Sequence, residues 1–131
     1  MAQLQRPLSP FMQYRWQYTN TTSILHRLSG VVLSVCFLLL VYWLAAAAAG
    51  PAAYQAALGR IGSVPAQAVL FAGLLSFCFH LLNGIRHLFF DAGYGFELPV
   101  ARTTGWIAGL GSIVLAVVLW LVLGATLGGA A

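Results

Sequence analysis

The sequence predicts an all-α integral membrane protein in which three membrane-spanning helices pack against helices of a partner. The first observation is composition: of 131 residues, 61% are hydrophobic and 6% are charged. A soluble domain carries about 25% charged residues, so water is not the main solvent of this chain. The second observation is three long apolar stretches. The third is that Gly- and Pro-rich connections separate them.

The apolar stretches define the elements in order. An N-terminal segment over residues 1–22 precedes the first span, at about 23–49. The second span covers about 65–90 and the third about 104–127. Each can cross about 30 Å of hydrocarbon at about 1.5 Å per residue. Backbone groups in lipid need internal hydrogen bonds, so these spans are expected to be helices within one domain over residues 1–131.

The connections carry turn residues. The first contains Gly50 and Pro51, and it predicts one short helical segment between residues 51 and 58. The second reads DAGYGFELPVAR and contains both acidic residues, Asp91 and Glu97. Neither connection resembles a linker to a second domain.

Arginine placement predicts the orientation. Five of the six arginines fall on one side of the predicted spans, namely Arg6, Arg15, Arg27, Arg86 and Arg102. The positive-inside rule then places the N-terminus in the cytoplasm and the C-terminus in the periplasm of a bacterial inner membrane. The N-terminus has no signal-peptide pattern. The net charge of +4 comes from arginines near helix ends, which fits anionic lipid and not nucleic acid.

Small residues indicate helix contacts, and little indicates catalysis. Gly30 with Ser34, and Gly105 with Gly109, are spaced four apart, which lets helix backbones approach closely. The two cysteines lie in apolar runs without a CxxC motif, so they are expected to be free and buried. No nucleophile–base arrangement or metal-ligand cluster is visible.

The first polar cluster opens span one. Ser23, His26 and Arg27 are three and four residues apart, so they can share the cytoplasmic mouth of that helix. A hydroxyl and a cation there suit a quinone carbonyl or a haem propionate. The alternative is a Ser N-cap with an Arg that reaches lipid headgroups.

The second cluster lies inside span two. His80, Gly84 and His87 recur at helical spacing. His80 lies about 16 Å before Asp91 along the axis, which predicts an axial ligand to haem iron, with Gly73 and Gly84 leaving room for the macrocycle. The alternative is a His that hydrogen-bonds a neighbouring helix.

A second haem ligand within this chain is not expected. His87 shares a helix face with His80, and His26 is predicted to lie about 12 Å nearer the surface. A bis-histidine haem would therefore take its other ligand from another polypeptide.

Three motifs resemble one family. RPLSP from Arg6, SILHRLSG from Ser23, and HLLNGIRHLFFDAG from His80 look like the cytochrome b subunit of succinate dehydrogenase, the larger of its two membrane anchors. The resemblance covers nearly the whole chain. It implies that His80 is an axial ligand of haem b, and that the small anchor supplies the other axial His.

The resemblance also implies the remaining site. Ser23 and Arg27 would help to form the ubiquinone pocket, while His26, Arg27 and His87 would lie near the haem propionates. The partners would be a flavoprotein subunit, an iron–sulfur subunit and the small anchor. Flavin and iron–sulfur clusters would reside only in the partner subunits, so this chain would not oxidise succinate itself. A fumarate reductase anchor, a structural anchor without haem, and a small transporter stay open as alternatives.

Overall fold

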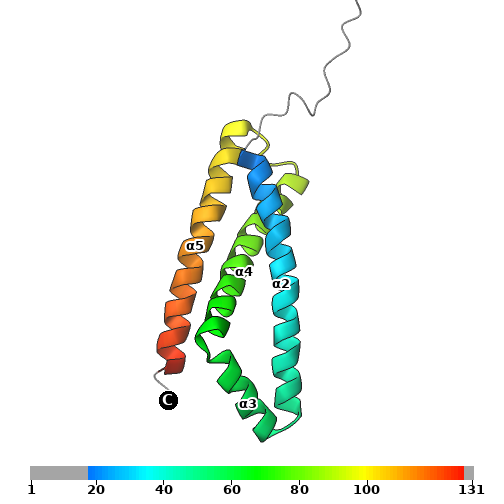
Figure 1. Cartoon of the computed structure of the whole chain (residues 1–131). Coiled ribbons are helices and arrows are strands. Elements are labelled where there is room, and N and C mark those ends of the chain that lie inside the picture. Colours follow the sequence, from blue (N-terminus) through cyan, green and yellow to red (C-terminus); the bar gives the residue numbers. More distant parts are fainter. Residues whose placement is uncertain (1–17, 129–131) are drawn as a thin grey trace, which may run out of the picture.

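The computed structural model describes residues 18–128, and within this range it contains four helices and no strand. They are α2 (Tyr18–Ala48), α3 (Pro51–Ile61), α4 (Val64–Asp91) and α5 (Leu98–Gly128). Helices α2, α4 and α5 run in alternating directions as a bundle, and α3 joins α2 to α4 at one end (Figure 1). These three are the described helices that are long and apolar enough to cross a membrane. The predicted all-α membrane fold is confirmed.

The start of α2, the end of α4 and the start of α5 meet at the same end of the bundle (Figure 1). We call this the Tyr18 end. Helix α2 already includes Tyr18, the first described residue, and so extends before residue 23, while α5 begins at Leu98 and not near residue 104. Each has 31 residues, or about 46 Å, so each is longer than a hydrocarbon layer of about 30 Å is thick.

The turns explain where the helices stop. The short helix predicted between residues 51 and 58 is confirmed, and it extends to Ile61. Gly50 precedes it with φ 111°, a conformation that residues with a Cβ rarely adopt. Gly93 and Gly95, with φ 88° and 82°, reverse the chain between α4 and α5.

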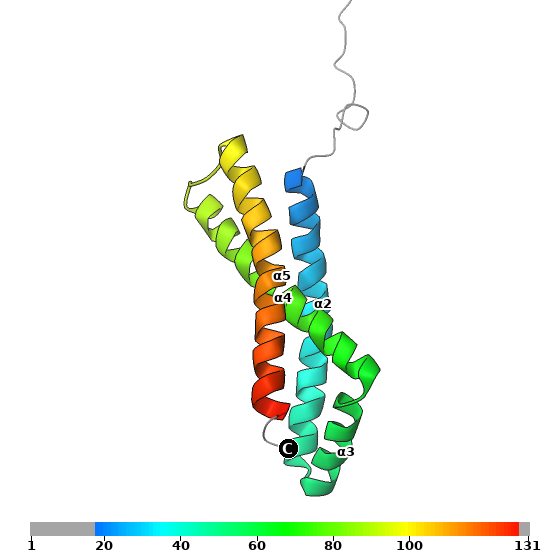
Figure 2. The same cartoon turned by 90° about the vertical axis from the view of Figure 1, so that its left-hand side faces the viewer.

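The core of the bundle consists mainly of small side chains, whereas large apolar side chains face outward. Helix α4 packs against both α2 and α5, and it crosses them obliquely (Figure 2). The buried apolar residues are Ala46, Ala57, Cys78, Ala101, Ala108 and Ala116. Phe37 and Leu121 are 62% and 64% exposed, as expected for faces that contact lipid or partner helices.

The predicted glycine contacts are largely present. A Cβ on Gly105 would lie 2.8 Å from Cε1 of Tyr18, and one on Gly109 would lie 3.8 Å from its hydroxyl. These glycines therefore admit the Tyr18 ring between α2 and α5. Gly30 faces α4, but Ser34 is exposed and bonds the Gly30 carbonyl of its own helix. Both cysteines are free, and Cys78 is buried as predicted, whereas Cys36 is only partly buried.

Candidate functional site

The three histidines form one cluster between α2 and α4 near the Tyr18 end. The His26 and His80 rings stack, with centroids 4.0 Å apart and planes 14° apart. The His87 ring lies 5.1 Å from the His26 ring at 45°. All three side chains are partly buried. The two polar clusters of the sequence are therefore one site in space.

The predicted depth difference between His26 and His80 is wrong. It assumed that span one starts near residue 23, which would leave His26 at the surface. Because α2 already includes Tyr18, His26 lies about 12 Å from Tyr18 along the helix axis, while His80 lies about 16 Å from the end of α4. Both distances run from the same end of the bundle, so the imidazoles reach nearly the same level.

Glycines give the rings their space, but in a different way from the one predicted. A Cβ on Gly30 would lie 3.2 Å from Cε1 of His80, and one on Gly84 would lie 3.8 Å from Cε1 of His26. Gly73 meets Cys36 of α2, whose Sγ would lie 2.7 Å from an added Cβ. Side chains of α2 therefore lie next to both Gly73 and Gly84, and the room for a macrocycle there stays a prediction.

Hydrogen bonds define the tautomer of His80. Its Nδ1 lies 3.2 Å from the carbonyl oxygen of His26 and 3.0 Å from Oγ of Ser29. A carbonyl oxygen can only accept, so Nδ1 carries the proton. The Ser29 hydroxyl donates to the same His26 carbonyl at 2.7 Å, which leaves its oxygen lone pairs free to accept from Nδ1. The Nε2 atom of His80 therefore carries a lone pair.

This arrangement fits an axial haem ligand. Metal-ligating histidines usually donate the other ring N–H to a carbonyl or a similar acceptor. Within residues 18–128, His26 Nδ1 is the only buried side-chain nitrogen or oxygen without a hydrogen-bond partner. The Nε2 atom of His80 also has no hydrogen-bond partner within residues 18–128. Because it is not one of the buried atoms without a partner, it must be exposed at the surface of the chain. The described residues contain no group of three or more His, Cys, Asp or Glu positioned to hold a metal ion.

The predicted quinone residues lie beside this cluster on α2. Ser23 is partly buried and Arg27 is exposed. Within the described part of the chain, neither side chain is hydrogen-bonded to the other or to a third residue. The described part of the chain therefore brings them near His26 and leaves their polar groups available. The motif that begins at Arg6 lies outside the described residues.

Sequence reasoning missed a buried polar network around Arg86, which it treated as a charge flanking the loop. Arg86 is only 7% exposed. Its Nε donates to Thr104 Oγ1 at 3.1 Å, its Nη2 to the Ala101 carbonyl at 2.9 Å, and its Nη1 to Asn83 Oδ1 at 3.4 Å. The guanidinium also lies 4.4 Å from the centre of the Phe90 ring. Arg86 therefore links α4 to α5.

Asn83 extends this network to α2. Its side chain is fully buried, and Nδ2 donates to the Thr22 carbonyl at 3.5 Å. The sequence does contain a sign of this network. Asn83 and Arg86 are three residues apart, which places both side chains on the same side of a helix.

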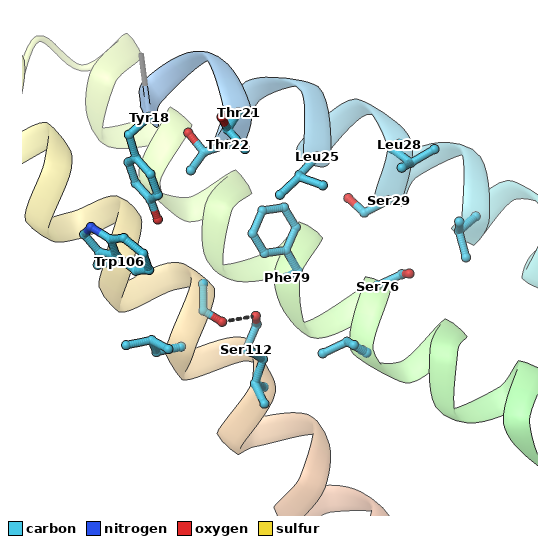
Figure 3. Close-up of a pocket in the computed structure, with 15 residues that line it drawn as sticks. Tyr18, Thr21, Thr22, Leu25, Leu28, Ser29, Ser76, Phe79, Trp106 and Ser112 are labelled. Carbon is cyan, nitrogen blue, oxygen red and sulfur yellow. Dashed lines mark hydrogen bonds between the residues drawn. The ribbon is translucent and has the colours of Figure 1, made fainter. Parts of the chain in front are cut away.

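A cavity of about 420 Å³ lies between α2, α4 and α5 (Figure 3). Tyr18 stacks on Trp106 at one end of it, with ring centroids 4.7 Å apart. Hydroxyl groups come from all three helices, and Ser29 is one of them. Ser29 thus lies between this cavity and the His80 ring.

Comparisons with known proteins agree with this architecture. A family described as succinate dehydrogenase/fumarate reductase transmembrane subunit matches residues 2–119. The succinate dehydrogenase cytochrome b556 subunit of Rickettsia prowazekii is 41% identical over 116 residues, which cover 88% of this chain and 90% of the relative. The cytochrome b556 subunit of Paracoccus denitrificans is 39% identical over 118 residues, covering 89% and 91%. The mitochondrial cytochrome b560 subunit of Mus musculus is 34% identical over 118 residues, covering 86% and 66%.

Proposed function

Since the chain belongs to the family of succinate dehydrogenase/fumarate reductase transmembrane subunits, we propose that it is the haem- and quinone-binding anchor of a succinate:quinone oxidoreductase. The observation that carries this proposal is His80. It lies within a membrane-spanning helix, its Nδ1–H is bonded to the His26 carbonyl, and its Nε2 has no hydrogen-bond partner among residues 18–128. The cytochrome b names of the relatives support the same conclusion.

His80 would be one axial ligand of haem b, through Nε2. When bound, a haem of this type accepts and donates single electrons. The small membrane anchor would supply the other ligand. His26 would not supply it in this arrangement, because its ring stacks on the His80 ring with centroids 4.0 Å apart, which leaves no room for a metal between the two rings. The stacking of the two rings is therefore the reason to expect a ligand from a partner subunit.

The haem propionates would lie toward His26, Arg27 and His87. His26 lies at the centre of this cluster, and its buried Nδ1 has no hydrogen-bond partner in the described chain. Arg27 offers an exposed cation on the next position of α2. His87 reaches the same cluster from α4 through its contact with the His26 ring.

Ser23 and Arg27 would form this chain's part of the ubiquinone site. A hydroxyl and a guanidinium can both donate to a quinone carbonyl, and their donation strengthens as charge develops on that oxygen. Ubiquinone takes up two electrons and two protons to become ubiquinol. The electrons come from succinate oxidation at the flavin of one partner through the clusters of the iron–sulfur subunit, so this chain contributes no succinate chemistry.

We further propose in which membrane the chain resides and which end of the bundle faces the cytoplasm. The complex would reside in a bacterial inner membrane, with the Tyr18 end on the cytoplasmic side. Arg27, Arg86 and Arg102 lie toward that end, and Arg60 lies at the other. This asymmetry is what the positive-inside rule describes.

Two other functions use the same fold. A fumarate reductase anchor would run the reaction in the other direction, and the family description covers both. A structural anchor would hold the partners without haem. Copurification of a flavoprotein with this chain, followed by a dithionite-reduced absorption spectrum, tests the proposal. An assembled complex without a b-type band would refute the haem proposal and favour the structural anchor.

A further inference from the structure

Ser29 links the predicted haem ligand to the cavity between the helices. It is only 6% exposed, and it comes from the helical turn that follows His26. Its oxygen accepts from Nδ1 of His80 at 3.0 Å, while its proton goes to the His26 carbonyl at 2.7 Å. The groups therefore form a chain of donors and acceptors that runs from the imidazole through the hydroxyl to the backbone.

We propose that Ser29 is a positioning residue that accepts from the Nδ1–H of His80, whose tautomer the His26 carbonyl sets, and strengthens its imidazole as an electron donor, which lowers the reduction potential at this site. The proposal rests on the haem function proposed above. None of the motifs that indicated a haem or a quinone assigned a role to Ser29.

The physical reason is the polarisation of the ring. An acceptor on the Nδ1–H makes the imidazole a more basic ligand at Nε2. A more basic axial ligand favours the oxidised metal and lowers the potential. Because Ser29 also donates onward to a carbonyl, the two bonds polarise each other. The His26 carbonyl lies 3.2 Å from the same Nδ1, so removal of the hydroxyl weakens this effect without abolishing it.

The chain provides a matched control. Ser112 is buried, lines the same cavity, and donates to the carbonyl three residues before it at 2.7 Å, as Ser29 does. It lies on α5 and has no bond to His80. Ser29→Ala and Ser112→Ala therefore remove equivalent hydroxyls, and only the first changes the ligand. Ser29→Thr and Ser29→Val form a second pair. Threonine and valine have nearly the same shape, but threonine has a hydroxyl where valine has a methyl group.

The test is a redox titration of the b-type absorption band in the purified complex. We expect Ser29→Ala to change the ratio of reduced to oxidised haem by about threefold to tenfold, which is the size of effect that one hydrogen bond has on an equilibrium. Tenfold equals about 59 mV for one electron, so Ser29→Ala should raise the potential by about 30–60 mV. Ser112→Ala and Ser29→Thr should keep the wild-type potential.

The outcomes separate this inference from the proposed function. A wild-type potential in an assembled Ser29→Ala complex that shows its b-type band would overturn the role of Ser29 and leave the haem proposal standing. Absence of the band from the wild-type complex would overturn both. If Ser29→Ala does not assemble, the proposal is tested by Ser29→Thr and Ser29→Val. Equal reduction potentials in these two variants would contradict it. A higher potential in Ser29→Val than in Ser29→Thr would support it.

Discussion

Arg86→Leu is expected to destabilise the helix bundle, because it leaves the Oδ1 atom of Asn83 without a hydrogen-bond donor. Thr104 Oγ1 keeps its bond to the Val100 carbonyl at 2.9 Å, and the Ala101 carbonyl keeps a contact with Thr104 Oγ1. Asn83 Oδ1 instead loses the only hydrogen bond that it makes within the described chain, and Asn83 is fully buried. An unsatisfied buried acceptor costs about 1–3 kcal/mol, so a loss of stability of this size is expected.

The assay is thermal melting of the purified complex, followed by tryptophan fluorescence. Arg102→Leu is the control, because Arg102 is an exposed arginine near the same end of the bundle. Adding Asn83→Leu to Arg86→Leu removes the unpaired acceptor, and replacement of both partners by apolar groups can be nearly neutral. The double variant should therefore melt above Arg86→Leu. The reasoning fails if Arg86→Leu melts like Arg102→Leu, or if the double variant is the least stable.

Three further outcomes follow from the site and the topology. Ser23→Ala or Arg27→Leu should weaken quinone reduction while succinate oxidation with an artificial acceptor survives, and equal loss of both activities would instead indicate an assembly defect. Gly30→Ala brings a Cβ to 3.2 Å from the His80 ring and should reduce haem content severalfold, whereas Gly124→Ala meets nothing within 4 Å and should not, as pyridine haemochrome assays would measure. A C-terminal alkaline phosphatase fusion should be active in the periplasm, and an inactive fusion would contradict the orientation.

The number and type of the helices could be predicted from the sequence because they depend on local properties. Apolar length identifies a span whatever it packs against. Gly50 and Pro51 identify the start of α3 because their backbone preferences are intrinsic. The grouping of His80, Gly84 and His87 on one face followed from helical periodicity alone.

The level of His26 could not be predicted in the same way. It depends on how far α2 extends before residue 23, and Tyr18 in that part of the helix packs on Trp106 and lies against Gly105. A hydropathy pattern does not predict such contacts between helices. The same holds for Ser29, whose bond to His80 joins residues 51 positions apart, and for Arg86, whose acceptors lie mainly on another helix.

The reduced absorption spectrum of a His80→Ala complex tests the central assignment most directly. Wild-type complex and Ser112→Ala should both show a b-type band after dithionite reduction. In an assembled His80→Ala complex, we expect that band to be lost or shifted, because His80 Nε2 is the proposed ligand atom of this chain. An unchanged spectrum in that variant would contradict the assignment.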